Sequence, residues 1–208
     1  MFSDRDRIRM PQRPLPDRDT PLIPSEPHLV FGRRLDVPAP PGFGEIWFGM
    51  GCFWGAERRF WQVEGVWLTA VGYAGGVTAH PSYEDVCSGR TGHAEVVRVI
   101  WDPDTLRLGD LLRVFWEVHD PTQGMRQGND VGTQYRSAIY TLKEADLQLA
   151  RRSRRDYEAA LQKAGLGRVT TEIRAAGTFY YAETYHQQYL VRHPDGYCGL
   201  QGTGVPCP

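Results

Sequence analysis

The order of strand-like and helix-like segments between residues 45 and 174 constrains the fold most strongly. Runs rich in β-branched and aromatic residues suit strands, and segments with apolar residues every three or four positions suit helices. The order strand–helix–strand occurs twice, which predicts an α/β (α+β) two-layer sandwich with a ferredoxin-like split βαβ core and a mixed sheet. The expected strands are Glu45–Met50, Val66–Tyr73, Ala94–Trp101, Tyr135–Thr141 and Val169–Arg174, and the expected helices are Phe53–Val63, Leu108–Val118 and Lys143–Lys163.

Two long loops, at residues 74–93 and 119–134, interrupt the regular pattern. Loops of this length inside a compact domain usually carry function. Thr141 and Glu144 form a capping-box signature for the last helix, and Gly165 marks its expected end. Asn129 and Asp130 lie in a polar stretch of the second loop that, taken alone, is typical of a plain turn.

The two ends of the chain differ from this middle part. Residues 1–44 hold nine of the fifteen prolines and follow no regular period, which predicts an extended Pro-rich arm, wrapped over the domain or partly mobile. Residues 45–194 are expected to form one α/β domain, because 208 residues with 41% hydrophobic content suffice for a single core. Residues 195–208 are too rich in glycine for regular structure, so we expect a mobile, coil-rich tail.

Composition and charge exclude several classes of protein. The formal charge of −1 gives no electrostatic reason to bind nucleic acid or an anionic membrane. No apolar run approaches the length of a transmembrane helix. The charged start of the chain, with Asp4, Arg5 and Asp6, lacks the apolar region of a secretory signal. We therefore expect a cytoplasmic protein.

In a reducing compartment, cysteines are more often catalytic, metal-binding or core residues than partners in structural disulfides. The chain has four: Cys52, Cys87, Cys198 and Cys207. A zinc site is one alternative, and its ligands would be His186, His193, Cys198 and Cys207. The absence of any Cys-x-x-Cys or other short paired spacing argues against it, so no metal is expected.

Cys52 lies at the junction between the first strand and the first helix. Gly49 and Gly51 allow the tight turn that such a junction needs. A cysteine at a helix start faces unpaired N–H groups and the positive end of the helix dipole, which favours the thiolate. Phe53 and Trp54 follow at once and suit an apolar wall beside a reactive sulfur.

Glu95 lies on the same face of its strand as Val97, Val99 and Trp101. A carboxyl on such a face is poorly solvated, so its pKa should rise and it could act as a general acid. The alternative is an ordinary carboxylate at a strand end with its head in water. Alternation alone leaves both open.

Other chemistry-bearing residues have simpler interpretations. Cys87 follows a loop without a helix-start signature, and we expect an inert, buried thiol. Cys198 and Cys207 differ, because a mobile tail can carry one sulfur to another for disulfide exchange. The spacing of Tyr180, Tyr181, Tyr185 and Tyr189 around His186 fits one packed face of a helix.

Five segments together resemble the type A peptide methionine sulfoxide reductases, which reduce the S epimer of methionine sulfoxide. The resemblance covers the chain from about Ile46 to Cys207, and the arm lies outside it. The segments are Gly51-Cys52-Phe53-Trp54-Gly55, Gly92-His93-Ala94-Glu95, Gln127-Gly128-Asn129-Asp130 with Gly132 to Ser137, Tyr181-Ala182-Glu183 with His186 to Leu190, and Gly196-Tyr197-Cys198-Gly199.

The resemblance implies a role for each matching residue. Cys52 is the nucleophile that attacks the sulfoxide sulfur, and Glu95 is the acid that protonates the oxygen. Tyr83 and Tyr135 resemble the family's tyrosines that hydrogen-bond this oxygen. The remaining positions are Asp130, which helps to organise the site, and Phe53 and Trp54, which form the apolar cage for the substrate methyl group.

The resemblance also implies a thiol cycle. Cys52 becomes a sulfenic acid, Cys198 condenses with it to a disulfide, and Cys207 exchanges with Cys198 before reduction by thioredoxin. The expected partners are methionine sulfoxide, free or in oxidised proteins, and thioredoxin, with no cofactor and a monomeric chain. The alternatives are a thiol peroxidase and a non-enzymatic redox-sensing or methionine-sulfoxide-binding module.

Overall fold

The computed structural model describes Pro11 and residues 13–208. Its strands are β1 Gly44–Met50, β2 Val66–Ala74, β3 Ala94–Trp101, β4 Arg126–Gln127, β5 Asp130–Val131, β6 Ser137–Thr141, β7 Glu172–Ala175 and β8 Tyr180–Tyr181. Its α-helices are α1 Phe53–Trp61, α2 Tyr83–Cys87, α3 Leu108–Val118, α4 Glu144–Lys163 and α5 Tyr189–Arg192, and short 3-10 helices span Thr133–Tyr135 and Thr184–His186.

Six strands form the main sheet in the order β7-β6-β1-β3-β2-β8. β3 lies between β1 and β2 and is antiparallel to both, so the unit β1–α1–β2 is a split βαβ. β6 is antiparallel to β1, whereas β6 and β7 are parallel, which makes the sheet mixed. The predicted α/β sandwich with a split βαβ core and a mixed sheet is confirmed.

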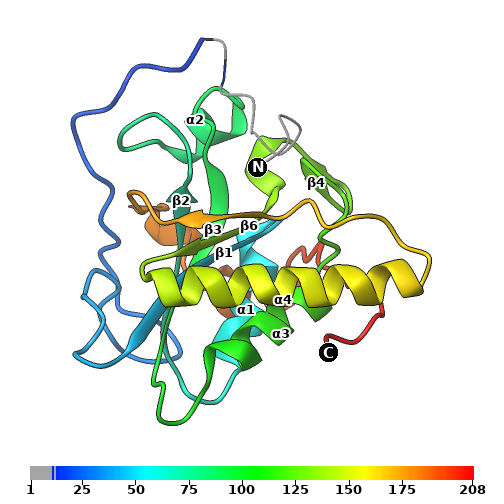
Figure 1. The fold of residues 1–208 in the computed structure, drawn as a ribbon. Coiled ribbons are helices and arrows are strands. Elements are labelled where there is room, and N and C mark those ends of the chain that lie inside the picture. Colours follow the sequence, from blue (N-terminus) through cyan, green and yellow to red (C-terminus); the bar gives the residue numbers. More distant parts are fainter. Residues whose placement is uncertain (1–10, 12) are drawn as a thin grey trace.

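The helices α1, α3 and α4 lie on one face of the sheet (Figure 1). The main core fills the space between these helices and the sheet, and Phe48 stacks there on Phe60 and Phe115 at ring-centroid distances of 4.8 and 5.2 Å. Side chains of β3 that face this core include Val97 and Val99. Because side chains alternate along a strand, Glu95 lies on this helix-covered face too.

The other face of the sheet is covered by coil. Leu35 and Val37 from the arm pack with Leu68 and Ile100, and Phe179 packs on Trp47 from the C-terminal side. The arm runs along the outside of the domain before it enters β1 (Figure 1). The described part of the arm is thus extended and wrapped over the domain.

Several local predictions are wrong. Thr141 ends β6 instead of capping α4, whose N-cap is Lys143 without a side-chain cap. A capping box forms instead between Ser82 and Asp85, at the start of α2, inside the expected loop 74–93. The expected loop 119–134 likewise contains β4, β5 and most of the 3-10 helix Thr133–Tyr135.

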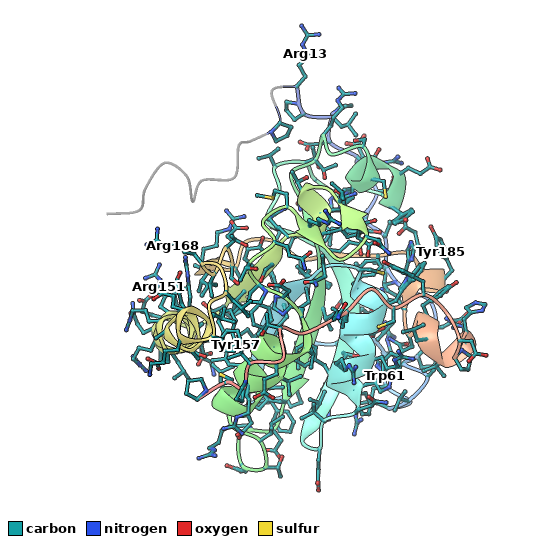
Figure 2. All side chains as sticks on the ribbon, turned by 90° about the vertical axis from the view of Figure 1, so that its right-hand side faces the viewer. Arg13, Trp61, Arg151, Tyr157, Arg168 and Tyr185 are labelled. Carbon is teal, nitrogen blue, oxygen red and sulfur yellow. The ribbon has the colours of Figure 1, made fainter. Side chains whose placement is uncertain are left out.

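The four tyrosines around His186 do not share one helix face. Tyr180 and Tyr181 form β8, Tyr185 lies in a 3-10 helix and Tyr189 begins α5. Figure 2 shows Tyr185 on the opposite side of the molecule from α4, which carries Arg151 and Tyr157.

The last segment of the chain, after Pro194, contains no helix or strand, as predicted. It nevertheless packs on the body of the domain, with Leu200, Val205 and Cys207 against the main core. Tyr157 of α4 hydrogen-bonds Thr203 Oγ1 at 2.8 Å and donates to the Val205 carbonyl at 3.2 Å. Mobility of this tail stays a prediction. Across the described part of the chain, no helix is long and apolar enough to cross a membrane.

Candidate active site

Cys52 is the N-cap residue of α1 and follows β1 through Gly51. Gly51 adopts φ +87°, and a Cβ at this position would lie 2.5 Å from Gln127 Cβ. Glycine is therefore required both for the left-handed turn and for the close approach of the loop that carries Gln127. This turn places the Cys52 thiol at the start of the helix, as predicted.

The surroundings of Cys52 do not favour the thiolate that its position at a helix start predicts. Burial raises the pKa of this thiol, and the neighbouring Glu95 carboxyl raises it further. A hydrogen bond from the Trp54 N–H acts in the predicted direction and lowers it. Desolvation outweighs the helix start here, so the free thiol keeps its proton.

Glu95 is 2% exposed and its Oε2 accepts a hydrogen bond from the Phe53 N–H at 3.0 Å. The carboxyl therefore lies at the first turn of the helix that Cys52 caps. Burial raises the pKa of Glu95 to about 8, the Phe53 N–H lowers it, and the negative charge of Asp130 raises it. The carboxyl is thus protonated at neutral pH, and the alternative of a solvated strand-end carboxylate is excluded by its burial.

An aromatic cluster adjoins Cys52, and we define it as Phe53, Trp54, Tyr83, His186 and Tyr189. Trp54 stacks on Tyr189 with ring centroids 3.8 Å apart, and its indole N–H donates to His186 Nδ1 at 3.1 Å. The His186 ring lies 5.2 Å from Phe53 and 4.6 Å from Tyr83. Burial lowers the pKa of His186 to about 4, so the ring is neutral.

Tyr83, the first residue of α2, and Tyr135, the last residue of the 3-10 helix Thr133–Tyr135, lie near Glu95. Burial raises the pKa of both hydroxyls, and the charge of Glu95 contributes to each shift. Tyr83 is held at the start of α2, where its N–H donates to Glu183 Oε1 at 2.8 Å. The same Glu183 accepts from the Tyr73 hydroxyl at 3.0 Å.

Asp130 connects the second long loop to the tail. Its Oδ2 accepts a hydrogen bond from the Tyr197 hydroxyl at 3.1 Å, and burial raises its pKa. Asp130 and Cys198 both contribute to the pKa shift of Cys52, so they belong to the same group of neighbours. Cys198 lies against α1, because a Cβ on Gly55 would be 2.6 Å from Cys198 Sγ.

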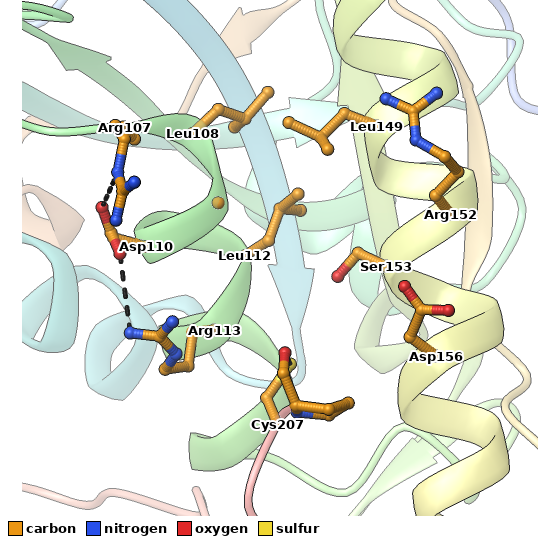
Figure 3. A pocket seen from close by; sticks show the side chains of 12 residues that line it. Arg107, Leu108, Asp110, Leu112, Arg113, Leu149, Arg152, Ser153, Asp156 and Cys207 are labelled. Carbon is orange, nitrogen blue, oxygen red and sulfur yellow. Dashed lines mark hydrogen bonds and ion pairs between the residues drawn. The ribbon is translucent and has the colours of Figure 1, made fainter.

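Cys207 lies apart from this group, in a pocket between α3 and α4 (Figure 3). Its N–H donates to Glu117 Oε1 at 2.9 Å. Leu108, Leu112 and Leu149 form the apolar part of the lining, and arginines and acidic groups surround it. Burial raises the pKa of the Cys207 thiol, so in this position the sulfur is protonated.

All four cysteines are free thiols. Cys87 ends α2 and is exposed, so the prediction of a buried thiol is wrong. The proposed zinc ligands do not assemble, because Cys207 lies in its own pocket. Among residues 11 and 13–208, no group of three or more His, Cys, Asp or Glu side chains could hold a metal ion.

Sequence reasoning missed several residues that build the site. Glu183, Tyr197 and Gln188 lie inside or beside recognised segments, yet their partners are far away in sequence. Glu57 is the clearest omission, since a glutamate on the buried side of an amphipathic helix is itself a signal.

A half-buried thiol beside a protonated carboxyl, with a second thiol against the same helix, defines a thiol-dependent oxidoreductase. Comparison of the chain with known proteins identifies the family within this class. Residues 44–204 match the family model described as peptide methionine sulfoxide reductase. The chain is 63% identical to peptide methionine sulfoxide reductase MsrA of Methylococcus capsulatus, over 95% of this chain and 89% of that protein. It is 59% identical to the MsrA of Brucella anthropi, over 99% of this chain and 95% of that protein.

Solved structures agree. Methionine sulfoxide reductase A of Corynebacterium diphtheriae superposes with a TM-score of 0.83 at 43% identity, covering 96% of this chain and 99% of that chain. Reduced Mxr1 of Saccharomyces cerevisiae superposes with a TM-score of 0.71 at 33% identity, covering 79% of this chain and 93% of that chain. The chain belongs to the type A peptide methionine sulfoxide reductase family, and its activity is the reduction of methionine sulfoxide.

Proposed function

We propose that Cys52 reduces methionine S-sulfoxide with Glu95 as the proton donor. The observation that carries this proposal is the hydrogen bond of 3.0 Å from the Phe53 N–H to Glu95 Oε2. It fixes a buried carboxylic acid at the helix turn that begins with the nucleophile. An acid with a pKa near the working pH is effective in both donating and regaining a proton, and the pKa of Glu95 is raised to about 8.

The chemical step transfers one oxygen atom. Cys52 sulfur attacks the sulfoxide sulfur while the S–O oxygen takes a proton from Glu95. The hydroxyl then moves to Cys52 sulfur as the transient bond between the two sulfurs and the substrate S–O bond break, so methionine leaves and Cys52 is oxidised to a sulfenic acid. The Cys52 thiol releases its own proton in this step, and that proton restores Glu95. Because the pKa of the free thiol is raised, loss of its proton is coupled to protonation of the substrate oxygen.

The aromatic cluster selects the substrate. Trp54 and Phe53 offer an apolar surface for the methyl group, and Tyr83 and Tyr135 provide hydroxyl donors for the oxygen. The sulfur of methionine sulfoxide is a stereocentre, so the methyl group, the oxygen and the rest of the side chain are arranged around it in opposite senses in the two epimers. Separate places for the methyl and the oxygen therefore favour one epimer.

Recycling uses two further thiols. Cys198 condenses with the sulfenic acid of Cys52, which forms a disulfide and releases water. Cys207 then attacks Cys198 and frees Cys52, which requires the segment from Thr203 onward to leave Tyr157 and Glu117. Thioredoxin then reduces the new disulfide. A structure of yeast Mxr1 in complex with Trx2 supports this choice of reductant. We propose that the protein acts as a cytoplasmic monomer, in a compartment where thioredoxin keeps thiols reduced.

The deciding experiment supplies dithiothreitol and a blocked methionine sulfoxide of each epimer, and it measures methionine formed per enzyme. We expect many turnovers with the S epimer and none with the R epimer. Turnover of the R epimer or of neither would contradict the proposal. Consumption of hydrogen peroxide, with dithiothreitol as the reductant, tests the peroxidase alternative.

The recycling order has its own test. Cys207→Ser is expected to keep turnover with dithiothreitol, which reaches the Cys52–Cys198 disulfide directly, and to lose most turnover with thioredoxin. Asp104→Asn, at an exposed position in the turn after β3, is the control and should change neither rate. Equal rates with thioredoxin for the wild type and Cys207→Ser would remove Cys207 from the cycle.

A further inference from the structure

A second buried carboxyl, Glu57, takes no part in the proposed chemistry. It is fully buried on α1, together with Thr69 of β2, Gln188 and His28 of the N-terminal arm. We call these four side chains the Glu57 cluster. Buried polar groups of this kind need complete hydrogen bonding, and their partners show how the arm is attached.

The hydrogen bonds of the Glu57 cluster have only one consistent direction. His28 Nδ1 accepts from the N–H groups of Val30 at 3.1 Å and Phe31 at 3.2 Å. The proton of a neutral His28 therefore sits on Nε2, which donates to Thr69 Oγ1 at 2.8 Å. The Thr69 hydroxyl in turn donates to Glu57 Oε1 at 3.0 Å.

This direction also decides the charge on His28. Nε2 of His28 and Oε1 of Glu57 are 3.9 Å apart, close enough for an ion pair. A protonated imidazole could not accept the two backbone N–H groups at Nδ1, however. Burial likewise lowers the pKa of His28 to about 3, so the link is a chain of hydrogen bonds from a neutral ring.

Gln188 closes the chain into a ring. Its N–H donates to Glu57 Oε2 at 2.8 Å and its side-chain amide donates to Oε1 at 2.7 Å. Its own Oε1 accepts from the Leu29 N–H at 3.4 Å, which returns to the arm next to His28. Glu57 thus accepts three hydrogen bonds and ties α1, β2 and the arm to the segment that contains Gln188.

Gln188 connects this ring of hydrogen bonds to the residues that hold Trp54. Gln188 has φ +46°, in the left-handed region that a side chain disfavours, and it stands between His186 and Tyr189. Those two residues hold Trp54, one by the indole hydrogen bond and the other by stacking. Trp54 and Glu57 are three residues apart on α1 and so share one side of the helix.

We propose that Glu57 is a positioning residue for substrate binding, and that the N-terminal arm, through His28, is a structural part of the binding site. The inference rests on the proposed role of Trp54 in binding the methyl group. The ring holds Gln188 in its left-handed conformation, and Gln188 in turn aims His186 and Tyr189 at Trp54.

The arm also fastens the opposite side of the site. Arg18 forms an ion pair with Asp85 of α2 at 2.6 Å, and the Leu15 N–H donates to the Arg90 carbonyl at 3.2 Å. These contacts hold the helix that begins with Tyr83. The arm therefore contacts both segments that face Trp54 and Phe53, the one with His186 and the one with Tyr83.

The sharpest test is Gln188→Gly in the full-length enzyme. Glycine can adopt a positive φ without strain, so folding is preserved. It adopts a negative φ about as readily, however, and with both side-chain hydrogen bonds of the ring lost the left-handed conformation is no longer held. We expect KM for methionine S-sulfoxide to rise about tenfold, as for loss of a hydrogen bond to a charged group, while kcat falls less than twofold. His28→Gln should return most of the affinity lost in His28→Ala, because the glutamine amide can still donate to Thr69.

Arg34→Ala is the matched control, since Arg34 is exposed in the same arm and its ion pair with Asp36 lies within the arm itself. It should leave KM unchanged. An unchanged KM in both Gln188→Gly and His28→Ala would overturn the inference, provided that the wild type reduces the S epimer. A wild type that reduces neither epimer would instead overturn the proposed function.

Discussion

Two buried carboxyls lie near the first turns of α1, and they are bound in different ways. Glu95 accepts one hydrogen bond, from the Phe53 N–H, whereas Glu57 accepts three. Burial raises the pKa of both, to about 8 for Glu95 and about 7 for Glu57. The difference teaches that burial alone does not make a catalytic acid. Glu95, beside the thiol, keeps oxygen lone pairs without a hydrogen-bond donor and can exchange a proton with the substrate. Glu57, whose oxygens accept three hydrogen bonds, holds neighbouring segments together.

The largest expected effect is on the chemical step. Glu95→Gln keeps the size of the side chain and the bond from Phe53 but removes the transferable proton. General acid catalysis contributes roughly 10²- to 10⁴-fold, so the single-turnover rate with the S epimer should fall by that factor with little change in substrate affinity. Stopped-flow tryptophan fluorescence or rapid quench measures this rate.

Glu84→Gln is the control for this substitution, because Glu84 is an exposed carboxylate on α2. It should retain the wild-type rate. A Glu95→Gln enzyme that changes only KM would make Glu95 a binding group, and the contrast with Glu57 would lose its basis.

The next effect is on stability and concerns Glu57. Glu57→Ala leaves the donors of Thr69 and Gln188 buried without an acceptor, so the free energy of unfolding should fall by about 3 kcal/mol. Chemical denaturation measures it. Glu64→Ala, at an exposed position in the turn after α1, should stay within about 0.5 kcal/mol of the wild type. Equal small losses for both variants would show that the Glu57 ring is not a stabilising element.

The smallest effect is the pH dependence of stability. Because the pKa of Glu95 is raised to about 8 from 4.5, the folded protein binds more protons than the unfolded chain between these values. Stability contributed by this group is therefore present below pH 4.5 and is lost as the pH rises to 8. Glu95→Gln lacks this loss, so its Tm should exceed that of the wild type by at least about 3 °C at pH 8.5 and by much less at pH 5. Parallel Tm profiles would contradict a raised pKa.

Much of this site could be predicted from short stretches of sequence. Glycines before Cys52 indicated the turn, and alternation along Ala94–Trp101 placed Glu95 on the same face as Val97 and Val99, because both features depend on a few neighbouring residues. Whether the carboxyl is buried was left open, and it is 2% exposed. The absence of helix or strand in the tail followed from its glycines for the same reason.

What could not be predicted depends on contacts between distant segments. α2 is only five residues long and is too short to show a helical period. Thr141 lost its expected capping role because β6 pairs with β1 through that residue. The position of Cys52 at a helix start indicated a thiolate, but burial among residues from other segments decides the pKa. Glu57 meets partners 12 and 131 residues away, which no local pattern reveals.

The most direct test of Glu95 as the proton donor is the titration of its carboxyl in the substrate-free enzyme. Carbon-13 NMR of enzyme with labelled glutamate carboxyls follows each group, and the signal that disappears in Glu95→Gln identifies Glu95. The structure predicts that this carboxyl stays protonated at pH 6 and titrates near pH 8. A Glu95 signal that is already ionised at pH 6 would contradict its role as the acid.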